Sequence, residues 1–283
     1  MMMIEVATED PMLSPGPKIS ADGVEQPKER SSSFPMRDER QLMEPLANLV
    51  RHTLHHPTVL AASPGDRRVL TQEMLALFLV QVTQMENSWA LPLLYSRDAQ
   101  AYLQTPSFFR WVRTTSAEHT ACHFVFSFLI CLVGRSLGYP SDVFPSAGEK
   151  YLASAAIRHL STLCRMYNDC GSFERDDAEK NINSLHFPDF QSTESQAVIS
   201  VAEKKGMLLQ LAQYERTCIE KTLQELAQEG AAGNVDGGPI RLCNARRMEI
   251  MRMYVHLTDL YGQIYVVQDP ASRVMSEGVT PQV

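Results

Sequence analysis

The stretch SAGEKYLASAAIRHLSTLCRMYNDCGSFERDDAEKN, residues 146–181, decides the fold, because its apolar residues recur at the spacing of one long helix. An α-helix turns about 100° per residue, so residues four apart drift only slowly around the axis. Continuing the apolar stripe places Asn168, Ser172 and Asp176 on the same side, so the stripe becomes polar without leaving the inward face. The apolar members of the stripe are Ala153, Ala156, Ile157, Leu160, Leu163, Cys164 and Tyr167.

Three oxygen-bearing side chains on successive inward turns have two interpretations. Burying an amide, a hydroxyl and a carboxylate is unfavourable unless each finds a partner, and a compact row of oxygen ligands suits a hard cation such as Mg²⁺. Gly171 has no side chain, so it would let such a ligand approach the helix closely. Alternatively, the helix ends here, because Asn, Asp, Gly and Ser are common in turns. The spacing alone leaves both interpretations open.

Outside this stretch the chain divides into a polar N-terminal segment and a long helical region. Residues 1–39 are rich in Pro, Ser and charge and have no helical or strand period, which predicts disorder. From about residue 40, apolar residues recur at helical spacing, and residues 194–230 form one long helix or two abutting ones. We expect an all-α fold, with one helical domain over 40–270 and a flexible tail over 271–283.

Composition narrows the classes of function. A formal net charge of −7 argues against a general nucleic-acid-binding protein, because phosphate binding needs a surplus of Lys and Arg. The six cysteines form no CxxC pair, and we expect buried free thiols in a cytoplasmic protein. The longest apolar run, residues 124–134, is shorter than the roughly 20 residues that cross a bilayer. We therefore expect no membrane span, and one buried helix over residues 115–135.

The pattern Asn168-Asp169-x-x-Ser172-x-x-x-Asp176 resembles the second metal-binding motif of class I terpene synthases, N/D-D-x-x-S/T-x-x-x-E. Its surroundings, LCRMYNDCGSFERDDAEKNINSLHFPDF, are more specifically similar to the C-terminal, class I domain of fungal bifunctional diterpene synthases of the copalyl diphosphate/ent-kaurene synthase type. The segments HPTVLAASPGDRR, VTQMENS, LLQLAQYERTC and LTDLYGQIYVVQD resemble the same domain in the same order. The resemblance covers about residues 41–270.

This resemblance implies an antiparallel helical bundle around an apolar cavity, with Mg²⁺ ions at its mouth that hold a prenyl diphosphate. Loss of diphosphate from a C20 substrate, copalyl or geranylgeranyl diphosphate, would leave an allylic carbocation that cyclises and is quenched by proton loss or water. By the same resemblance Asn168, Ser172 and Asp176 would bind one Mg²⁺. Arg165, one turn earlier, would approach the diphosphate, although a surface position is the alternative for this residue.

The sequence also departs from the family pattern. The first acidic motif of the family, D-D-x-x-D on an earlier helix, has no good match, because Asp38-Glu39 is followed by Leu42 and Glu86 stands alone. Asp176 replaces the usual Glu, and no DxDD motif is present. We therefore expect a truncated domain, incomplete at its N-terminus. The hypotheses are a Mg²⁺-dependent diterpene synthase, an inactive homologue that pairs with another synthase subunit, and, least favoured, an unrelated helical scaffold.

Other candidate groups are expected to be structural. His52 and His56 have a zinc-compatible spacing but no third ligand, so we expect a surface helix. His119 and His123 are expected as core histidines. A methionine stripe near the C-terminus should pack in the core, and a basic cluster beside it should be a solvated helix face, with contact to a diphosphate as the alternative. The stripe is Met248, Met251 and Met253, and the cluster is Arg246, Arg247 and Arg252.

Overall fold

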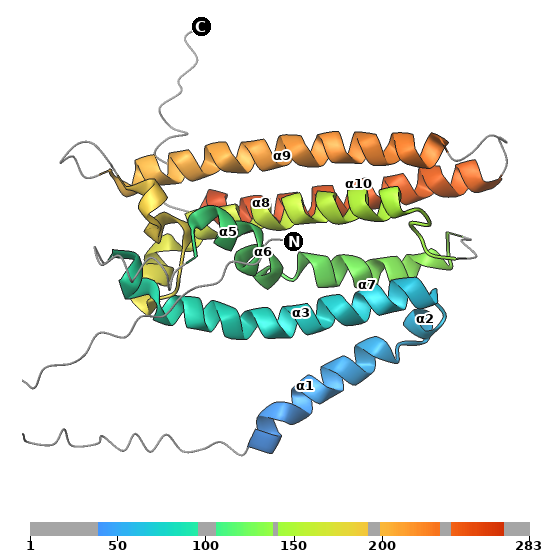
Figure 1. Ribbon diagram of the computed structural model, residues 1–283, viewed down its shortest axis with the longest axis horizontal. Coiled ribbons are helices and arrows are strands. Elements are labelled where there is room, and N and C mark those ends of the chain that lie inside the picture. The colour runs from blue at the N-terminus through green and yellow to red at the C-terminus, as the bar shows by residue number, and fades with distance from the viewer. Residues whose placement is uncertain (1–38, 96–105, 138–140, 192–198, 233–238, 269–283) are drawn as a thin grey trace, which may run out of the picture. The chain divides into compact units, whose positions relative to one another are not determined.

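The computed structural model describes residues 39–95, 106–137, 141–191, 199–232 and 239–268 (Figure 1). These residues form helices and contain no strand, which confirms the predicted all-α class. The elements are α1 (Glu39–Leu54), α2 (Pro57–Leu60), α3 (Pro64–Trp89), η1 (Leu91–Tyr95), α5 (Phe108–Arg113), α6 (Thr115–His119), α7 (Cys122–Gly134), α8 (Ala147–Glu179), η2 (Ser184–His186), η3 (Pro188–Phe190), α9 (Val201–Ala232) and α10 (Pro239–Gln268).

The chain divides into two units, residues 1–45 and 46–283. Within the first unit only the beginning of α1 is described. The segments predicted to be disordered, residues 1–39 and 271–283, lie outside the described residues apart from residue 39. Those two predictions, and the boundaries of the domain between them, remain predictions.

Helix α8 runs without interruption through residues 168–176, so the interpretation of this stretch as a helix end is wrong. The helix begins at a capping box, in which the Ser146 hydroxyl accepts a hydrogen bond from the Glu149 amide and the Glu149 carboxylate accepts one from the Ser146 amide. It ends only at Lys180, whose φ of 61° is left-handed. The motif residues therefore keep the regular helical spacing that the sequence predicted.

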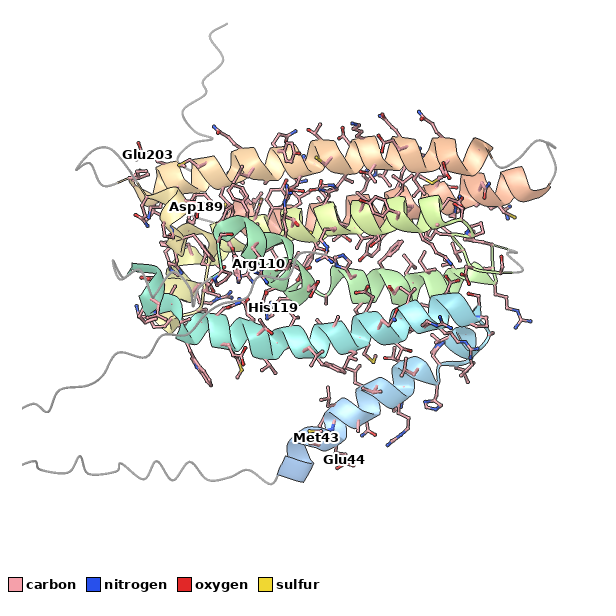
Figure 2. All side chains as sticks on the ribbon, viewed as in Figure 1. Met43, Glu44, Arg110, His119, Asp189 and Glu203 are labelled. Atoms are coloured by element: carbon pink, nitrogen blue, oxygen red, sulfur yellow. The ribbon has the colours of Figure 1, made fainter. Side chains whose placement is uncertain are left out.

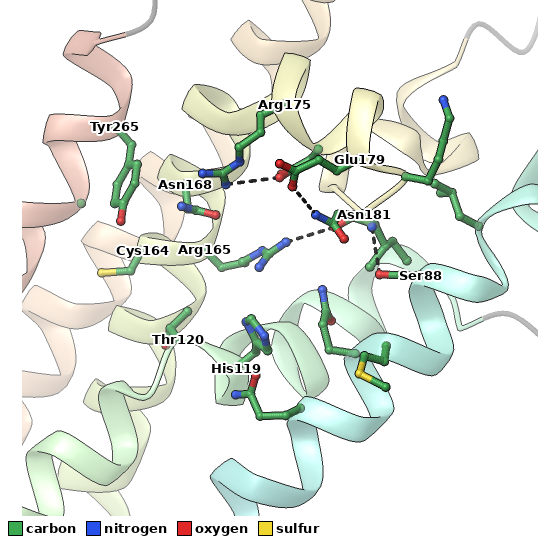
Figure 3. A pocket seen from close by; sticks show the side chains of 18 of the residues that line it. Ser88, His119, Thr120, Cys164, Arg165, Asn168, Arg175, Glu179, Asn181 and Tyr265 are labelled. Carbon is green, nitrogen blue, oxygen red and sulfur yellow. Dashed lines mark hydrogen bonds and ion pairs between the residues drawn. The ribbon is translucent and has the colours of Figure 1, made fainter. Parts of the chain in front are cut away.

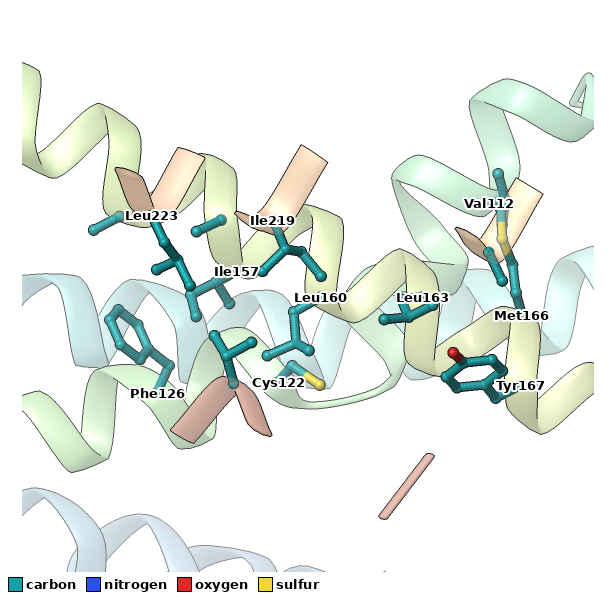
Figure 4. Close-up of a cluster of buried hydrophobic side chains, with 14 of the residues drawn as sticks. Val112, Cys122, Phe126, Ile157, Leu160, Leu163, Met166, Tyr167, Ile219 and Leu223 are labelled. Carbon is teal, nitrogen blue, oxygen red and sulfur yellow. The ribbon is translucent and has the colours of Figure 1, made fainter. Parts of the chain in front are cut away.

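The core is built around α8. This helix packs along α9 and α10, and Figure 1 shows the three running side by side. Figure 4 shows part of the shared apolar cluster, in which Leu160 and Leu163 of α8 join Ile219 and Leu223 of α9. Hydrogen bonds also link the three helices. Arg216 of α9 donates to the Tyr167 hydroxyl of α8 (2.6 Å) and to Asp259 of α10 (2.8 Å).

On the other side of α8 lie α6 and α7, and α3 packs against both of these helices. Residues 115–135, expected as one helix, are broken: α6 ends at His119 and α7 begins at Cys122, with a bend of 46° between the α5–α6 segment and α7. Ala121 stands at the break with a left-handed φ of 62°. The Thr120 hydroxyl donates to the Ala117 carbonyl and accepts from the Cys122 amide, which satisfies backbone groups that the break releases.

The structure also tests two predictions about helix length. Residues 201–232 form a single helix, α9, rather than two abutting ones. Within the described residues, no single helix is long and apolar enough to cross a membrane, and only the bent α5–α6 and α7 pair has the combined length and composition.

Gly171 serves helix packing rather than the approach of a ligand. A Cβ atom at this position would overlap the backbone carbonyl of Tyr265 on α10, coming within 2.7 Å of its carbon. The absence of a side chain therefore lets α10 lie against α8 at the level of the motif. Gly206 in α9 is a natural comparison, because a Cβ atom there would meet no atom within 4 Å.

We expect Gly171→Ala to lower the free energy of unfolding by about 2 kcal/mol, because overpacking against backbone typically costs 1–3 kcal/mol. Gly206→Ala should raise it by about 0.5–1 kcal/mol, since alanine is the better helix former. Urea denaturation followed by circular dichroism measures both variants. Equal effects of the two substitutions would contradict the close contact between α8 and α10.

Candidate metal and diphosphate site

A cavity of about 900 Å³ opens beside the polar half of α8 (Figure 3). Six parts of the chain line it: the C-terminal half of α3, η1, the break between α6 and α7, α8, the loop that follows α8, and α10. The break places His119, Thr120 and Cys122 in the wall. The sequence analysis missed this contribution, because no glycine or proline marks the break.

The structure brings the three motif residues to one side of α8. Asn168 and Asp176 line the cavity, and Ser172, which is buried, lies between them along the helix. The Ser172 hydroxyl donates a hydrogen bond to Oδ2 of Asp176 at 2.6 Å. Asn168 lies beside Tyr265 of α10, and the Tyr265 hydroxyl shares a hydrogen bond with the Asn168 side chain.

These residues fit a hard cation by their chemistry. Among the described residues, no three His, Cys, Asp or Glu side chains gather closely enough to hold a metal ion. A cation in the cavity would therefore need amide and hydroxyl oxygens as well as a carboxylate, and Asn168, Ser172 and Asp176 offer one of each. Asp176 is only 4% exposed, so its carboxylate is shielded from solvent.

Asp169, the second residue of the motif, has a structural role. Its side chain has no exposure to solvent, and Oδ1 lies 2.6 Å from Nε of Arg165, one turn earlier. Oδ2 accepts hydrogen bonds from the Ser184 amide at 2.9 Å and from the Ser184 hydroxyl at 2.5 Å. Burial raises the pKa of Asp169 to about 6, and the Arg165 guanidinium and the Ser184 hydrogen bonds limit this rise.

Arg165 lines the cavity but is buried, so the surface alternative for this residue is wrong. Besides Asp169, its guanidinium donates to the Ile182 carbonyl at 3.1 Å and lies 5.3 Å from the centre of the Trp111 ring. These contacts fix the guanidinium at the cavity wall.

The loop that follows α8 completes the site, and the sequence analysis did not identify it. Asn183 is fully buried, and its side-chain amide donates to the Asp169 carbonyl at 3.0 Å and to Oδ2 of Asp176 at 2.9 Å. The available signal was a pair of polar residues, Asn183 and Ser184, flanked by the apolar Ile182 and Leu185.

The charges around the cavity are mixed. Arg165 and Arg175 provide positive charge, while Asp176 and Glu179 provide negative charge. Burial and the nearby Arg165 lower the pKa of His119 to about 4, so this histidine is neutral at pH 7. The described residues of α3 that line the cavity include no carboxylate, because they are Gln81, Gln84, Met85, Ser88 and Trp89.

The histidines that the sequence singled out have different surroundings. Nδ1 of His52 is 2.8 Å from the Asn48 carbonyl on the exposed face of α1, and His56 caps α2 by accepting a hydrogen bond from the Thr58 amide. His123 is buried and shares a hydrogen bond of 3.1 Å with Ser161, which confirms the prediction of a core histidine. His119, predicted to lie in the core, instead lines the cavity.

The basic cluster of α10 is neither a solvated face as a whole nor a ligand for the cavity. Arg246 and Arg252 are exposed, but Arg247 is 1% exposed and pairs with Glu149 of α8 at 2.5 Å. The predicted methionine stripe is partly confirmed, because Met248 and Met251 are buried and Met253 is exposed. Figure 2 shows all described side chains on the ribbon.

Sequence comparison relates most of the chain to known diterpene synthases. The chain is 37% identical over 238 residues to ent-kaur-16-ene synthase of Phaeosphaeria sp. strain L487, covering 82% of this chain and 23% of that protein. It is 35% identical over 234 residues to ent-kaur-16-ene synthase of Fusarium fujikuroi, covering 82% of this chain and 24% of that protein. It is 34% identical over 226 residues to pimaradiene synthase of Emericella nidulans, covering 79% of this chain and 22% of that protein.

The chain is a homologue of part of the fungal diterpene synthases. It spans about a quarter of the length of these relatives. No family model matches the sequence, and no solved structure matches it.

We expect Asp169→Ala to lower the free energy of unfolding of this diterpene synthase homologue by about 3–5 kcal/mol, because it leaves the buried Arg165 without its counter-ion. The matched control is Asp177→Ala, whose side chain is 59% exposed and whose removal should change stability by less than about 0.5 kcal/mol. Urea titration of both variants measures the difference. A small effect of Asp169→Ala would show that the ion pair does not organise this end of α8.

Proposed function

We propose that the cavity is the reaction site of a class I diterpene synthase, in which Mg²⁺ and the chain together ionise a C20 prenyl diphosphate for cyclisation. The observation that carries the proposal is the placement of Asn168 and Asp176 on one cavity wall, with Ser172 between them and Arg165 one turn away. The similarity to ent-kaur-16-ene and pimaradiene synthases supports the same substrate class. Copalyl and geranylgeranyl diphosphate are the proposed substrates.

In this proposal Asn168, Ser172 and Asp176 would hold a Mg²⁺ ion, which would supply positive charge to stabilise the departing diphosphate. The bond between the allylic carbon and the diphosphate oxygen breaks, and both electrons leave with the diphosphate. Arg165 binds the diphosphate oxygens from a side chain that is already fixed by Asp169 and the Ile182 carbonyl. Because these contacts exist before substrate arrives, little ordering is needed when the anion binds.

The remaining carbon skeleton is a cation, and the cavity wall has to exclude water from it until a proton is lost. The apolar part of the wall is suited to this role, and a neutral His119 adds no positive charge that would oppose the cation. The apolar wall residues are Met85, Trp89, Leu91, Pro92, Ile182 and Tyr261.

A second candidate is a catalytically inactive homologue that acts as a helical partner of another synthase subunit. The observation in its favour is the α3 wall, where the described cavity residues include no carboxylate to complement Asp176 across the cavity. We also propose a cytoplasmic location, which is supported by six free cysteines, three of them buried.

The test is turnover by the purified 283-residue chain with copalyl diphosphate or geranylgeranyl diphosphate and Mg²⁺, with the hydrocarbon product detected by gas chromatography and mass spectrometry. Asn168→Ala and Asp176→Ala should each lower the Mg²⁺-dependent rate by at least about 100-fold, because each removes a metal ligand. Asp177→Ala, one residue along the helix but exposed, should keep the wild-type rate.

An unchanged rate in Asp176→Ala would contradict the assignment of Asp176 as a metal ligand. If the wild-type chain shows no turnover, calorimetric titration with Mg²⁺ and a non-hydrolysable geranylgeranyl diphosphate analogue separates the candidates. If the chain binds the analogue and Asp176→Ala abolishes this binding, the result favours an incomplete metal and diphosphate site. If the chain does not bind the analogue, the result favours the inactive homologue.

A further inference from the structure

Two cysteine thiols from different helices meet in the wall of the cavity. Cys122 is the first residue of α7 and Cys164 lies within α8, and both residues line the cavity. Their side chains share a hydrogen bond. The other four cysteines, all of them among the described residues, do not line the cavity. The proposed reaction uses neither thiol, so the pair requires a separate explanation.

Contacts with neighbouring elements hold both cysteines in place. The Tyr254 hydroxyl of α10 donates a hydrogen bond to the Cys122 carbonyl at 2.8 Å, and the Cys122 amide donates to the Thr120 hydroxyl at 3.4 Å. Sγ of Cys164 lies 3.7 Å from the Thr258 carbonyl of α10. Figure 3 labels Cys164 at the cavity, and Figure 4 labels Cys122 in the adjoining core. The two thiols are therefore brought together by the fold itself.

The two thiols differ in acidity. The hydrogen bond from Cys164 lowers the pKa of Cys122, and the Thr120 and Ser161 hydroxyls add to this effect, which outweighs that of burial. The same hydrogen bond and burial raise the pKa of Cys164. Cys122 also stands in the first turn of a thirteen-residue helix, where unpaired backbone amides favour a thiolate. The pair thus holds one thiol that ionises readily and one that keeps its proton.

The remaining cysteines provide a comparison. Cys131 lies in the same helix with no exposure to solvent, and burial raises its pKa to about 12. Cys218 and Cys243 are half-buried and therefore more accessible than Cys122, which is 7% exposed. Accessibility alone would make Cys218 and Cys243 the first thiols to react. Thiolate character, together with access from the cavity, instead favours Cys122.

We propose that Cys122 is an oxidation site for small hydroperoxides and that Cys164 is the resolving cysteine, which converts the oxidised residue into a reversible disulfide. A readily ionised thiol beside a second cysteine is the arrangement found at thiols that respond to oxidants. The cavity gives a molecule as small as hydrogen peroxide a path to both sulfur atoms. Formation of this disulfide requires neither Mg²⁺ nor a prenyl diphosphate, so it goes beyond the proposed function.

The reaction with hydrogen peroxide balances in two steps. The Cys122 sulfur attacks one peroxide oxygen, the O–O bond breaks, and the other oxygen leaves as hydroxide, which takes up the Cys122 proton to become water. The Cys164 sulfur then attacks the sulfenic acid at Cys122, the S–O bond breaks, and the hydroxide leaves with the Cys164 proton as a second water. Two thiols lose two electrons and two protons, and the peroxide is reduced to two waters.

The disulfide would lie in the wall of the proposed reaction site. Cys164 directly precedes Arg165 and stands one helical turn before Asn168. Any effect of the disulfide on the proposed reaction rests on the proposed function, whereas formation of the disulfide does not. The experiment therefore detects the disulfide by mass and not by turnover, so that failure of one proposal leaves the other intact.

The first experiment treats the reduced 283-residue chain with hydrogen peroxide at pH 7 and follows the products by intact mass and peptide mapping. We expect the loss of two hydrogen atoms and a cross-link between Cys122 and Cys164. This cross-link should form at least about 10-fold faster than any oxidation of Cys218 or Cys243, and dithiothreitol should reverse it. In urea, where the fold no longer holds the two thiols together, the preference for this pair should disappear.

The second experiment separates the roles of the two thiols. Cys164→Ala should stop the reaction at a sulfenic acid on Cys122, which dimedone captures, whereas Cys122→Ala should yield neither the sulfenic acid nor the cross-link. Cys131→Ala is the matched control, because Cys131 lies in the same helix and does not line the cavity. It should form the cross-link at the wild-type rate. Circular dichroism establishes that each variant is folded, and the wild-type peptide map decides if one is not.

Three results would overturn the proposal. The first is oxidation of the wild-type chain that begins at Cys218 or Cys243. The second is a sulfenic acid at Cys122 that persists in the wild-type chain without forming a disulfide, because Cys164 would then not be a resolving cysteine. The third is a preference for the Cys122–Cys164 cross-link that survives unchanged in urea, because the fold would then not be its cause.

Discussion

The burial of one carboxylate, that of Asp169, organises the whole site. A carboxylate with no solvent exposure must find its partners within the protein, and those partners come from Arg165 on one side and Ser184 on the other. The first contact fixes a guanidinium at the cavity wall. The second draws the loop after α8 back along the helix, which places Asn183 against Asp176. The proposed ligands and the proposed diphosphate contact are thus held by one structural interaction.

Periodicity alone predicted α8 and its inward face, because the pattern of this helix is local and long. It could not decide between helix and turn at residues 168–172, since Asn, Asp, Gly and Ser favour turns when considered singly. Tertiary contacts decide the matter: Asp169 accepts hydrogen bonds from Ser184 in the loop after α8, and Gly171 admits the backbone of Tyr265. The same contacts explain why the glycine belongs to helix packing and not to ligand approach.

The features that the sequence analysis missed are non-local. The break between α6 and α7 has no glycine or proline, and the left-handed Ala121 is stable only in the surroundings that the fold provides. Arg247 looked like part of a solvated basic face because its partner Glu149 stands on α8, far away in the sequence. Asn183 follows the motif by seven residues, but its two acceptors become visible only once the loop has folded back.

Asp176 shows why this wall suits a cation. Oδ2 of its buried carboxylate accepts hydrogen bonds from two neutral groups, the Ser172 hydroxyl and the Asn183 amide, which do not balance its charge. Oδ1 accepts a hydrogen bond of 3.3 Å from Arg175, whose side chain is 61% exposed, so the charge of this arginine is well screened. The Ser172 oxygen keeps lone pairs for a metal while its proton points to Asp176. A divalent ion bound at Oδ1 would therefore neutralise the carboxylate while the Ser172 and Asn183 hydrogen bonds to Oδ2 still position it.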